Sequence, residues 1–256
     1  AEVRARAVIL ATGVRERPRS ARLVPGDRPA GVLTTGALQQ FTTLHHQPVG
    51  TRAVVVGAEH VSFSAVLTLA HGGCKVVAMV TTLPRHQTYG PLKLATASRH
   101  RVPIHTGVGI AEIFGRTRVE AVVLTDGRRI ACDTIVFTGD WIPDHELARS
   151  AGLPMLPSAK SPIVDDGWHT EQRGVFAIGN LIHPAETADV CALDGRAVAA
   201  HVMDWLALDR WPTAVAPVKV AAPILWAATS SVGLTFRVAQ FVTGSVQASN
   251  GSEVLH

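Results

Sequence analysis

The stretch TRAVVVGAEHVSFSAVLTLAHGGCKVVAMV, residues 51–80, decides the fold class of this 256-residue chain. Residues 51–60 carry an aliphatic run that ends at a glycine. Residues 61–73 have helical spacing and stop at two glycines, and residues 74–80 are again apolar. Two buried strands joined by a helix within about thirty residues predict a right-handed β-α-β crossover and a parallel sheet.

Three other apolar runs end at a glycine in the same way: AVILATG (7–13), CDTIVFTG (132–139) and GVFAIGN (174–180). We expect each run to be a buried strand, because strands covered on both faces read as continuous aliphatic segments. Residues 32–44 and 187–208 predict helices, the second capped at Thr187. Asp126-Gly127 predicts a hairpin turn between two further strands.

The composition bounds the class of protein. A hydrophobic content of 47% with 17% charged residues favours a large buried core and excludes disorder. Seven arginines lie within the first 28 residues, but no aromatic residues are interleaved with them. We interpret these arginines as a solvated edge and expect no nucleic-acid partner.

Several other site classes are excluded by spacing. Cys74, Cys132 and Cys191 form no C-x-x-C pair, which argues against a redox dithiol, and the scattered histidines lack metal-ligand spacing. We expect Cys191 to be a buried small hydrophobe, no metal, and a reducing, cytoplasmic location. Residues 220–236 are uncharged but too short and too polar for a membrane span, so none is expected.

Three motifs stand in an informative order: ILATG (9–13), VVVGAEHVS (54–62) and GVFAIGN (174–180). This order resembles the pyridine nucleotide-disulfide oxidoreductase superfamily of flavoproteins with two dinucleotide-binding domains. The longer stretches around these motifs resemble amine-oxidising members, namely the flavin subunits of opine oxidases and hydrogen cyanide synthase and the α subunits of sarcosine oxidase. The resemblance covers about residues 3–208.

The resemblance implies an α/β, Rossmann-like FAD/NAD(P)-binding fold in which an NAD-type βαβ domain is inserted into an incomplete FAD-binding domain. The implied limits are 1–50 for the first part of the FAD domain, 51–139 for the NAD(P)-like domain, 140–210 for the returning FAD segment and 211–256 for a C-terminal extension. The family's first FAD element, a strand followed by G-x-G-x-x-G, is expected upstream of this sequence. We therefore expect an N-terminally incomplete flavoprotein.

By the same resemblance, FAD would contact both strand ends and the start of the long helix. Asn180 stands where the family usually has an aspartate that binds the ribityl chain. The helix that starts near Thr187 would direct its positive end at the flavin pyrimidine. The implied FAD-binding residues are Ala11, Thr12, Gly13, Gly139, Gly179, Asn180, Glu186, Thr187 and Ala188.

The implied NAD(P) turn consists of Gly57, Glu59 and Ser62. Glu59 replaces the second glycine of the fingerprint, where a carboxylate would repel and crowd a pyrophosphate. Ser62 replaces the third glycine with a tolerable small residue. Two alternatives stay open: NAD(P) binding, and a domain that is kept only for structure.

These features lead to a main functional hypothesis and two alternatives. The main one is FAD-dependent oxidation of a secondary amine or an amino or imino acid by hydride transfer to flavin, with His183 and Glu186 as catalytic candidates. Partner flavoprotein or iron–sulfur subunits are implied by the resemblance. The first alternative is an NAD(P)H-dependent flavoprotein reductase. The second is a truncated, non-catalytic chain that serves as an assembly or interaction subunit. For His183 and Glu186 themselves, a purely structural role is the alternative to catalysis.

Overall fold

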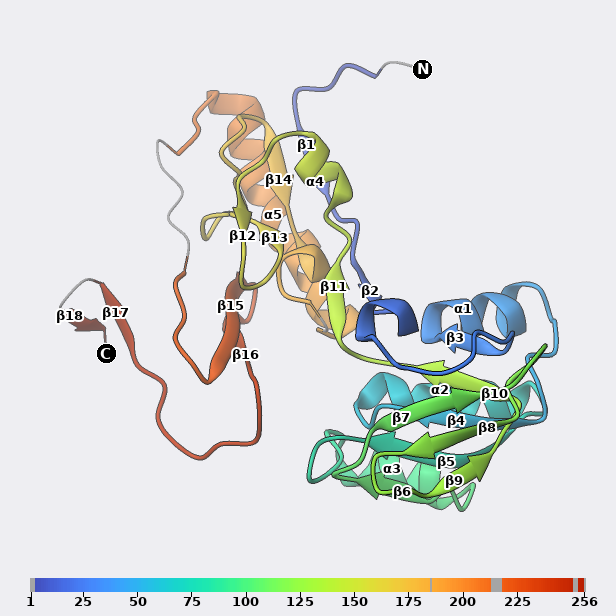
Figure 1. Cartoon of the computed structure of the whole chain (residues 1–256). Coiled ribbons are helices and arrows are strands. Elements are labelled where there is room, and N and C mark those ends of the chain that lie inside the picture. Colours follow the sequence, from blue (N-terminus) through green and yellow to red (C-terminus); the bar gives the residue numbers. More distant parts are fainter. Residues whose placement is uncertain (1–2, 185, 213–217, 251–252, 256) are drawn as a thin grey trace. The chain divides into compact units, whose positions relative to one another are not determined.

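The computed structural model describes residues 3–184, 186–212, 218–250 and 253–255, which form two compact units. The central unit spans residues 13–144. The outer unit combines residues 1–12 with residues 145–256. Figure 1 shows both units, and each is described here by itself.

The central unit is built on a five-stranded sheet in which all neighbouring strands are parallel. In spatial order the strands are β3 (Val32–Thr34), β10 (Thr134–Phe137), β4 (Arg52–Val56), β5 (Lys75–Thr81) and β6 (Ile104–Thr106). The chain continues from β4 to β5 on one side, while β10 lies on the other. The strand order therefore reverses between β4 and β10, and ligands of open α/β sheets bind at the carboxyl ends of strands at such a reversal.

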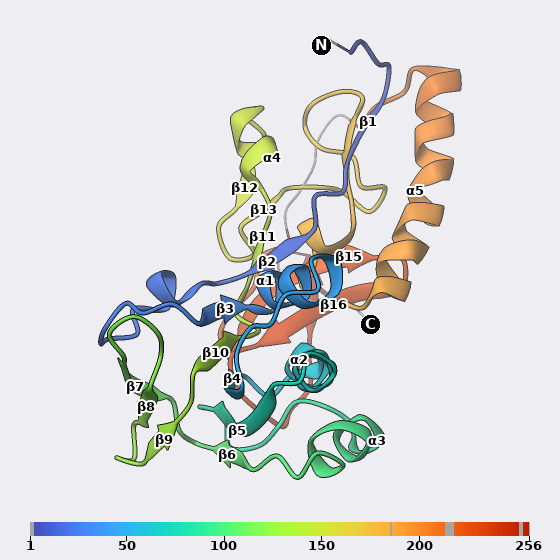
Figure 2. The ribbon, with the colours of Figure 1, turned by 90° about the vertical axis from the view of Figure 1, so that its right-hand side faces the viewer.

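The two faces of this sheet are covered by different elements (Figures 1 and 2). One face carries helices, and the other carries a three-stranded antiparallel sheet. The helices are α1 (Thr35–Gln39) with its π-helical continuation (Gln40–Leu44), α2 (His60–His71), and α3 (Gly90–Lys93) with its continuation (Leu94–Ser98). The antiparallel strands are β7 (Ile110–Phe114), β8 (Ala121–Leu124) and β9 (Arg129–Ala131).

Alternation along β4 shows how the sequence fills both faces. Ala53 and Val55 pack with the helices, whereas Val54 packs with the antiparallel sheet. All three side chains are fully buried. The aliphatic run at 51–60 is thus explained by burial on both faces. The predicted crossover through α2 and the hairpin at Asp126-Gly127 are confirmed.

One element of the central unit differs from the prediction. Residues 32–34 of the predicted helix 32–44 form β3, and α1 begins only at Thr35, with Thr34 as its N-cap. Val32 and Leu33 pair with Ile135 and Val136 of β10. The unpaired side of β10 offers backbone hydrogen bonds to this segment, so the tertiary partner outweighs the local helical pattern.

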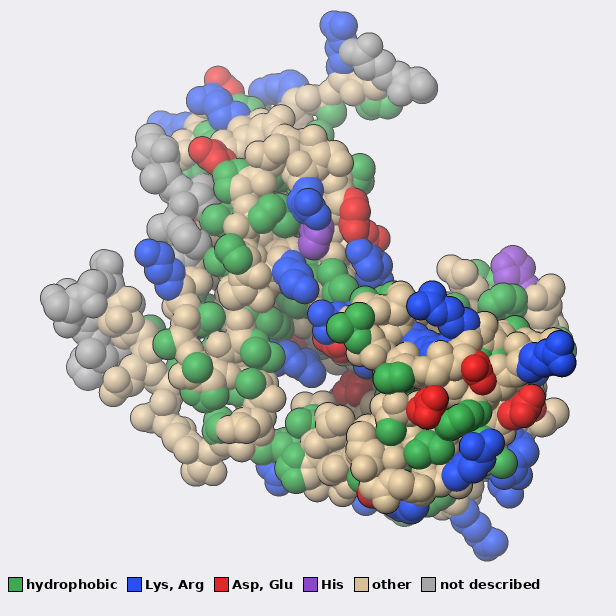
Figure 3. All heavy atoms as spheres, in the orientation of Figure 1, with side chains coloured by type: hydrophobic (Ala, Val, Ile, Leu, Met, Phe, Trp, Pro, Cys, Tyr) green, Lys and Arg blue, Asp and Glu red, His purple; other side chains and the backbone are tan. Residues whose placement is uncertain are grey.

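The two ends of the central unit are joined to each other. β2 (Val14–Glu16) pairs antiparallel with β11 (Trp141–Pro143), and the N–H of Asp144 donates to the carbonyl of Gly13 at 2.9 Å. A 3-10 turn at Arg19–Arg22 follows β2. The arginines of this segment serve the structure: Arg17 pairs with Asp140 at 3.1 Å. On the face drawn in Figure 3, basic and acidic side chains are interspersed over the central unit.

The outer unit contains a two-stranded parallel sheet of β1 (Val8–Leu10) and β14 (Val175–Ala177) and the long helix α5 (Ala188–Leu208). Phe176, Trp168, Val198 and Trp205 form one of its two apolar clusters. The remaining elements are α4 (Glu146–Ser150), β12 (Met155–Leu156), β13 (Ser161–Pro162), a 3-10 turn (Gly179–Leu181), β15 (Ile224–Ser230), β16 (Gly233–Val238), β17 (Ala248–Asn250) and β18 (Glu253–Leu255).

Two expectations about burial in the outer unit are wrong. β1 is not a buried strand: Val8 is 43% exposed and Ile9 is 45% exposed, because β14 is the one strand that pairs with β1 in the described part of the chain. Cys191 is only partly buried, since it lies in the first turn of α5. Residues 224–238, which include most of the uncharged stretch, form the β15–β16 hairpin.

Candidate functional site

In the central unit two glycine turns lie side by side at the point where the strand order reverses. Gly57 directly follows β4, and Thr138 and Gly139 directly follow β10. The N–H of Thr138 donates to Val56 O at 3.0 Å. The helix α2 starts next to this point, directly after Glu59. The structure thus brings the predicted residues Gly57, Glu59 and Gly139 together at one sheet edge.

Gly57 is required by both its backbone conformation and its surroundings. Its φ is +143°, and a Cβ atom built there would lie 1.9 Å from Thr138 Oγ1 and 2.6 Å from Ser62 Oγ. Ser62 is fully buried, and its hydroxyl is 2.6 Å from that of Thr138. The first glycine of the fingerprint and the small third residue therefore serve close packing of α2 against the strand ends.

Glu59 fills the space that the fingerprint normally keeps open. It is the N-cap residue of α2, and its Oε2 accepts a hydrogen bond from the N–H of Ala58 at 3.0 Å. Its Oε1 is buried without a hydrogen-bond partner among the described residues. A Cβ atom on Gly139, whose φ is +64°, would lie 2.8 Å from Oε1. The carboxylate is therefore packed between two glycine turns.

A positively charged side chain, Arg22, also lies at this edge of the sheet. Arg22 donates from Nη2 to the carbonyls of Thr138 and Gly139, each at 2.8 Å. Partial burial lowers the pKa of Arg22, while the carboxylates of Asp140 and Glu59 counteract this effect. A guanidinium and a helix N-terminus together form an environment that favours an anion. In this structure the anion is the Glu59 side chain.

This arrangement can be tested against a dinucleotide. A pyrophosphate needs close approach to the backbone of the turn and free N–H groups at the helix start. Here the N–H of Ala58 is bonded to Glu59, and the neighbouring carboxylate would repel the phosphate. The turn as arranged does not fit NAD(P).

The outer unit forms a second sheet edge, from two segments that are far apart in sequence. β1 and β14 run parallel with Val8 opposite Val175, so Ala11 and Thr12 leave the sheet at the same edge as Gly179 and Asn180. The N–H of Ile178 donates to Leu10 O at 3.0 Å. Gly13, which follows this edge in sequence, belongs to the central unit.

Gly179 and Asn180 shape the turn after β14. Gly179 has a φ of +64°, and an added Cβ would meet only ordinary contacts with Cys191, so glycine is needed for its conformation rather than for space. The Asn180 side chain bonds to Glu186 twice: Nδ2 donates to Glu186 O at 3.0 Å, and Oδ1 accepts from Glu186 N at 2.8 Å. Asn180 therefore closes the loop that leads to α5.

The N-terminus of α5 carries no cap from Thr187, although Thr187 is the N-cap residue as predicted. Asp189 in the first turn is fully exposed, and hydrogen bonds, first from the Thr187 hydroxyl and then from backbone N–H groups, lower its pKa. Ala188 is exposed beside it. This helix start follows the Asn180–Glu186 loop, and its N–H groups at Asp189 and Val190 donate to the Asp189 carboxylate.

These residues fit the isoalloxazine edge of FAD. The left-handed glycine turn and the positive end of the α5 dipole are the features of this edge that suit polar ring atoms, whereas the Asn180 amide is bonded to Glu186. The residues implied for FAD in this unit are thus adjacent along one edge: Ala11, Thr12, Gly179, Asn180, Glu186, Thr187 and Ala188. Their role in binding stays a prediction, as do the roles of Gly13 and Gly139 in the central unit.

His183 lies deeper than its sequence suggested. It is fully buried, and its Nε2 is 2.5 Å from Oδ2 of Asp194, which is also fully buried. Asp194 Oδ1 accepts from the N–H of Ser231 at 2.8 Å. His183 Nδ1 has no hydrogen-bond partner among the described residues. Glu186, the other catalytic candidate, is half-buried and held through its backbone.

Asp194 and Thr138 are residues that the sequence reasoning missed. Asp194 lies on the same face of α5 as the buried Val198, four residues on, so an acidic residue on an apolar helical stripe was an available signal. Thr138 precedes Gly139 at the end of a buried strand, where a polar side chain also stands out from an aliphatic run.

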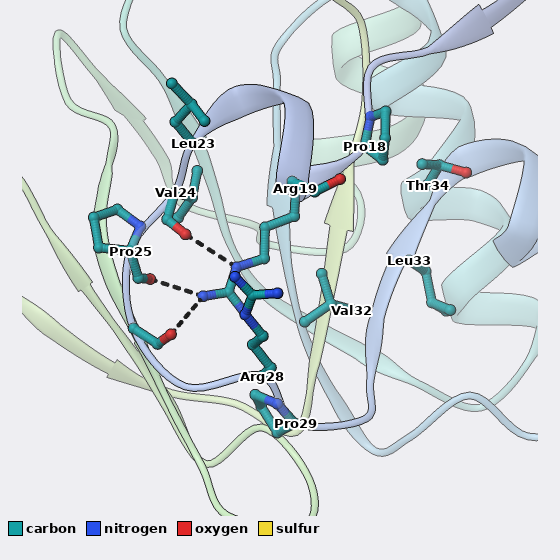
Figure 4. A pocket seen from close by; sticks show the side chains of 12 residues that line it. Pro18, Arg19, Leu23, Val24, Pro25, Arg28, Pro29, Val32, Leu33 and Thr34 are labelled. Carbon is teal, nitrogen blue, oxygen red and sulfur yellow. Dashed lines mark hydrogen bonds between the residues drawn. The ribbon is translucent and has the colours of Figure 1, made fainter.

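A pocket of about 760 Å³ lies elsewhere in the central unit and is lined by residues of the segment 18–34 (Figure 4). Arg19 closes this loop by donating to the carbonyls of Val24, Pro25, Gly26 and Asp27. Burial lowers the pKa of Arg19, and the nearby Arg28 lowers it further. The lining contains no carboxylate, histidine or cysteine, so we assign no chemistry to it.

The residues that the structure describes contain neither a candidate membrane span nor a candidate metal site. Among them, no helix is both long and apolar enough to cross a bilayer. No group of three or more histidine, cysteine, aspartate or glutamate side chains in that part of the chain could hold a metal ion.

Similarity to known proteins agrees with the fold. A solved ferredoxin reductase for the CYP199A2 system from Rhodopseudomonas palustris superposes with a TM-score of 0.59 at 28% identity, over 77% of this chain and 52% of that chain. A thioredoxin reductase of T. acidophilum superposes with a TM-score of 0.66 at 20% identity, over 79% of this chain and 67% of that chain, and shows the fold alone. The prediction of an α/β, Rossmann-like fold is confirmed.

Two curated relatives are both named as ferredoxin reductase components of dioxygenase systems. The chain is 30% identical over 182 residues to the ferredoxin reductase component of the chlorobenzene dioxygenase of Cupriavidus sp. (strain PS12), which covers 68% of this chain and 42% of that protein. It is 26% identical over 187 residues to the benzene 1,2-dioxygenase system ferredoxin–NAD(+) reductase subunit of Pseudomonas putida, covering 70% of this chain and 44% of that protein. The chain thus spans less than half the length of these relatives.

These relatives correct the narrower part of the resemblance. They are ferredoxin reductases, and they do not support the likeness to opine oxidases, hydrogen cyanide synthase or sarcosine oxidases. The wider part is confirmed, because a family model described as pyridine nucleotide-disulphide oxidoreductase matches residues 1–214. The chain belongs to the pyridine nucleotide-disulphide oxidoreductase family.

Proposed function

We propose that this protein is a FAD-dependent reductase that takes electrons from NAD(P)H and passes them to an iron–sulfur protein. The observation that carries the proposal is the parallel pairing of β1 with β14, which sets the Ala11-Thr12 and Gly179-Asn180 turns at one edge. The relatives that match the chain are reductases of this kind by name. Oxidation of a secondary amine has no such support.

The chain's own residues have defined tasks in this proposal. Gly179 lets the backbone turn sharply at the end of β14, and Asn180 holds the following loop against the start of α5. The positive end of the α5 dipole favours negative charge on a reduced flavin ring. When bound, FAD supplies the ability to accept a hydride and to release electrons one at a time.

The test uses the full chain after reconstitution with FAD. We expect a flavin absorption spectrum that is bleached anaerobically by NADH or NADPH and restored by an oxidised [2Fe–2S] ferredoxin. The Asn180→Ala variant should bind FAD about tenfold more weakly, because a net loss of about 1.4 kcal/mol of hydrogen bonding corresponds to that factor. Gln172→Ala, an exposed amide in the same unit, is the matched control and should bind normally.

Two results would overturn the proposal. The first is a folded chain that retains no FAD after reconstitution. The second is a flavin that is bleached by sarcosine or an opine but not by either nicotinamide nucleotide, which would restore amine oxidation as the function.

A further inference from the structure

Glu59 disagrees with the nucleotide turn in which it lies. The surrounding groups favour an anion: α2 starts beside the turn, and Arg22 is bonded to the strand end opposite. The residue between them is itself an anion, and its Oε2 uses the N–H of Ala58. A protein that only needed to fill this space would have no reason to place a charge there.

The position of the carboxylate matches that of an external phosphate. Backbone N–H groups at a helix start and a nearby guanidinium are the donors that bind phosphates in parallel α/β sheets. Glu59 accepts one of these N–H groups. Burial lowers the pKa of Arg22, and the charge of Glu59, after that of Asp140, counteracts part of this effect. A Cβ atom added at Gly57 or at Gly139 would lie 2.8 Å from one of the Glu59 carboxylate oxygens, so the carboxylate lies beside both turns, where a ligand would need to approach the backbone.

The side chain has freedom to leave this position. Glu59 has φ −92° and ψ 176°, an extended conformation open to any residue, so its placement depends on side-chain rotation and not on backbone strain. One of its two oxygens, Oε1, has no hydrogen-bond partner among the described residues. One N–H hydrogen bond, from Ala58, is the hydrogen bond that the carboxylate makes among the described residues, so few directional contacts oppose its rotation.

We propose that the Glu59 carboxylate is an internal competitor of dinucleotides, which occupies the pyrophosphate position beside the Gly57 and Gly139 turns so that NAD(P)H binds only after this side chain rotates outward. The inference rests on the proposed function for the choice of ligand. It makes Glu59 the residue that limits nucleotide affinity in this chain. The end of β5 adds to the weakness, since neither Thr81, its last residue, nor Thr82, which follows it, offers a carboxylate to ribose hydroxyls.

The experiment compares binding of three probes to the full chain by calorimetry: NADH, ADP and adenosine. We expect Glu59→Ala to bind NADH and ADP at least about tenfold more tightly than the unmodified chain, because a like-charge contact of this kind is removed. Glu59→Gln keeps the size of the side chain and should show part of the gain. Adenosine has no phosphate, and its affinity should be unchanged.

The matched control is Glu120→Ala, which removes one exposed carboxylate from the same unit but outside the nucleotide turn at residues 57–62. It should leave all three affinities unchanged. Should Glu59→Ala fail to fold, as judged by circular dichroism, Glu59→Gly serves in its place, because glycine is accepted at an N-cap position.

Equal affinities of the folded Glu59 variants and the unmodified chain for NADH and ADP would overturn the inference, as would absence of binding in all of them. An equal gain in Glu120→Ala would also overturn it, since the effect would then be one of net charge. The proposed function fails separately: Glu59→Ala that binds NADH tightly, but whose flavin NADH does not bleach, would keep the inference and reject the function.

Discussion

Acidic side chains in this chain repeatedly serve as acceptors for backbone N–H groups. Glu59 accepts from Ala58, Asp133 from Thr51 and Arg52, and Asp194 from Ser231. Amides that leave regular structure at strand and helix ends need such partners, because unpaired backbone groups are costly. These three carboxylates therefore act as structural hydrogen-bond acceptors.

Asp133 gives a prediction about acid stability. Burial alone would raise its pKa, but hydrogen bonds from the Thr51 hydroxyl and from the N–H groups of Thr51 and Arg52 lower it to about 2. A carboxyl whose folded pKa is lowered stabilises the protein above its unfolded pKa of about 3.9, and this stabilisation is lost as the pH falls toward 2. The free energy of unfolding should therefore fall between about pH 4 and pH 2.

The variant Asp133→Asn tests this prediction. It should lower the free energy of unfolding by about 1–2 kcal/mol at pH 7, because the amide cannot accept all the hydrogen bonds. Its stability should also change less between about pH 4 and pH 2 than that of the unmodified chain. Asp204→Asn, at an exposed position on α5, is the control. Urea unfolding curves measure the free energy of unfolding at pH 7 and its change with pH. If that change were the same in Asp133→Asn as in the unmodified chain, Asp133 would not be the group responsible.

The cysteines should differ in reactivity. Burial raises the pKa of Cys74 and of Cys132 to about 11, and both are almost fully buried. Cys191 is partly exposed, and burial raises its pKa as well. We expect a maleimide at about pH 8 to label Cys191 in the folded chain and the other two only in urea. Mass spectrometry of digests identifies the labelled site, and native labelling of Cys74 or Cys132 would refute the order.

At the scale of elements, the local sequence pattern and the available tertiary partner together decide which strands form and how deeply they are buried. The aliphatic runs of β4 and β5 and the helical spacing of α2 are strong enough that the crossover follows from them alone. β3 is three residues long and forms because β10 offers a free side, which no local pattern contains. β1 has an equally apolar sequence, yet β14 is its one described strand partner and two of its residues are half exposed.

The His183–Asp194 pair links three elements and gives a prediction for them. Asp194 connects α5 to the loop that carries His183 and to the turn between β15 and β16. Asp194→Ala should destabilise the outer unit by about 3 kcal/mol, because it leaves a buried imidazole and an N–H group without an acceptor. Denaturant unfolding measures the change.

A matched control separates the pair from general effects on the helix. Asp189→Ala changes an exposed aspartate of the same helix and should have a small effect. The hydrogen exchange rate of the Ser231 amide should rise in Asp194→Ala only. Equal stability of the two variants would show that the buried pair does not stabilise the unit.

At the scale of the whole molecule, the chain leaves one unit and returns to it. Residues 13–144 have two apolar clusters of their own, one on each face of the parallel sheet. The predicted limits of the domains placed residues 1–50 with the FAD domain, and those limits stay predictions. β3 and α1, which lie before residue 50, pack with the central sheet.

We expect residues 13–144 to fold without the rest of the chain. Their ends are paired through β2 and β11, so cutting at these points leaves few contacts unpaired. Thermal unfolding of this segment should be cooperative by circular dichroism. Residues 13–139, which lack β11, form the control and should melt at a lower temperature. A non-cooperative melt of 13–144 would contradict its autonomy.

The sequence by itself determined the parallel sheet, the crossover at 51–80, the hairpin at Asp126-Gly127 and the family, because aliphatic runs and glycine turns are local signals with few structural solutions. Only the tertiary structure decided what the polar residues do. Glu59 accepts a hydrogen bond within its own nucleotide turn, and His183 is a buried hydrogen-bond partner of Asp194. Asn180 holds the loop at Glu186 through hydrogen bonds. The physical reason is that a polar group bonds with whatever donor or acceptor the fold brings to it, and those partners are distant in sequence or depend on side-chain rotation.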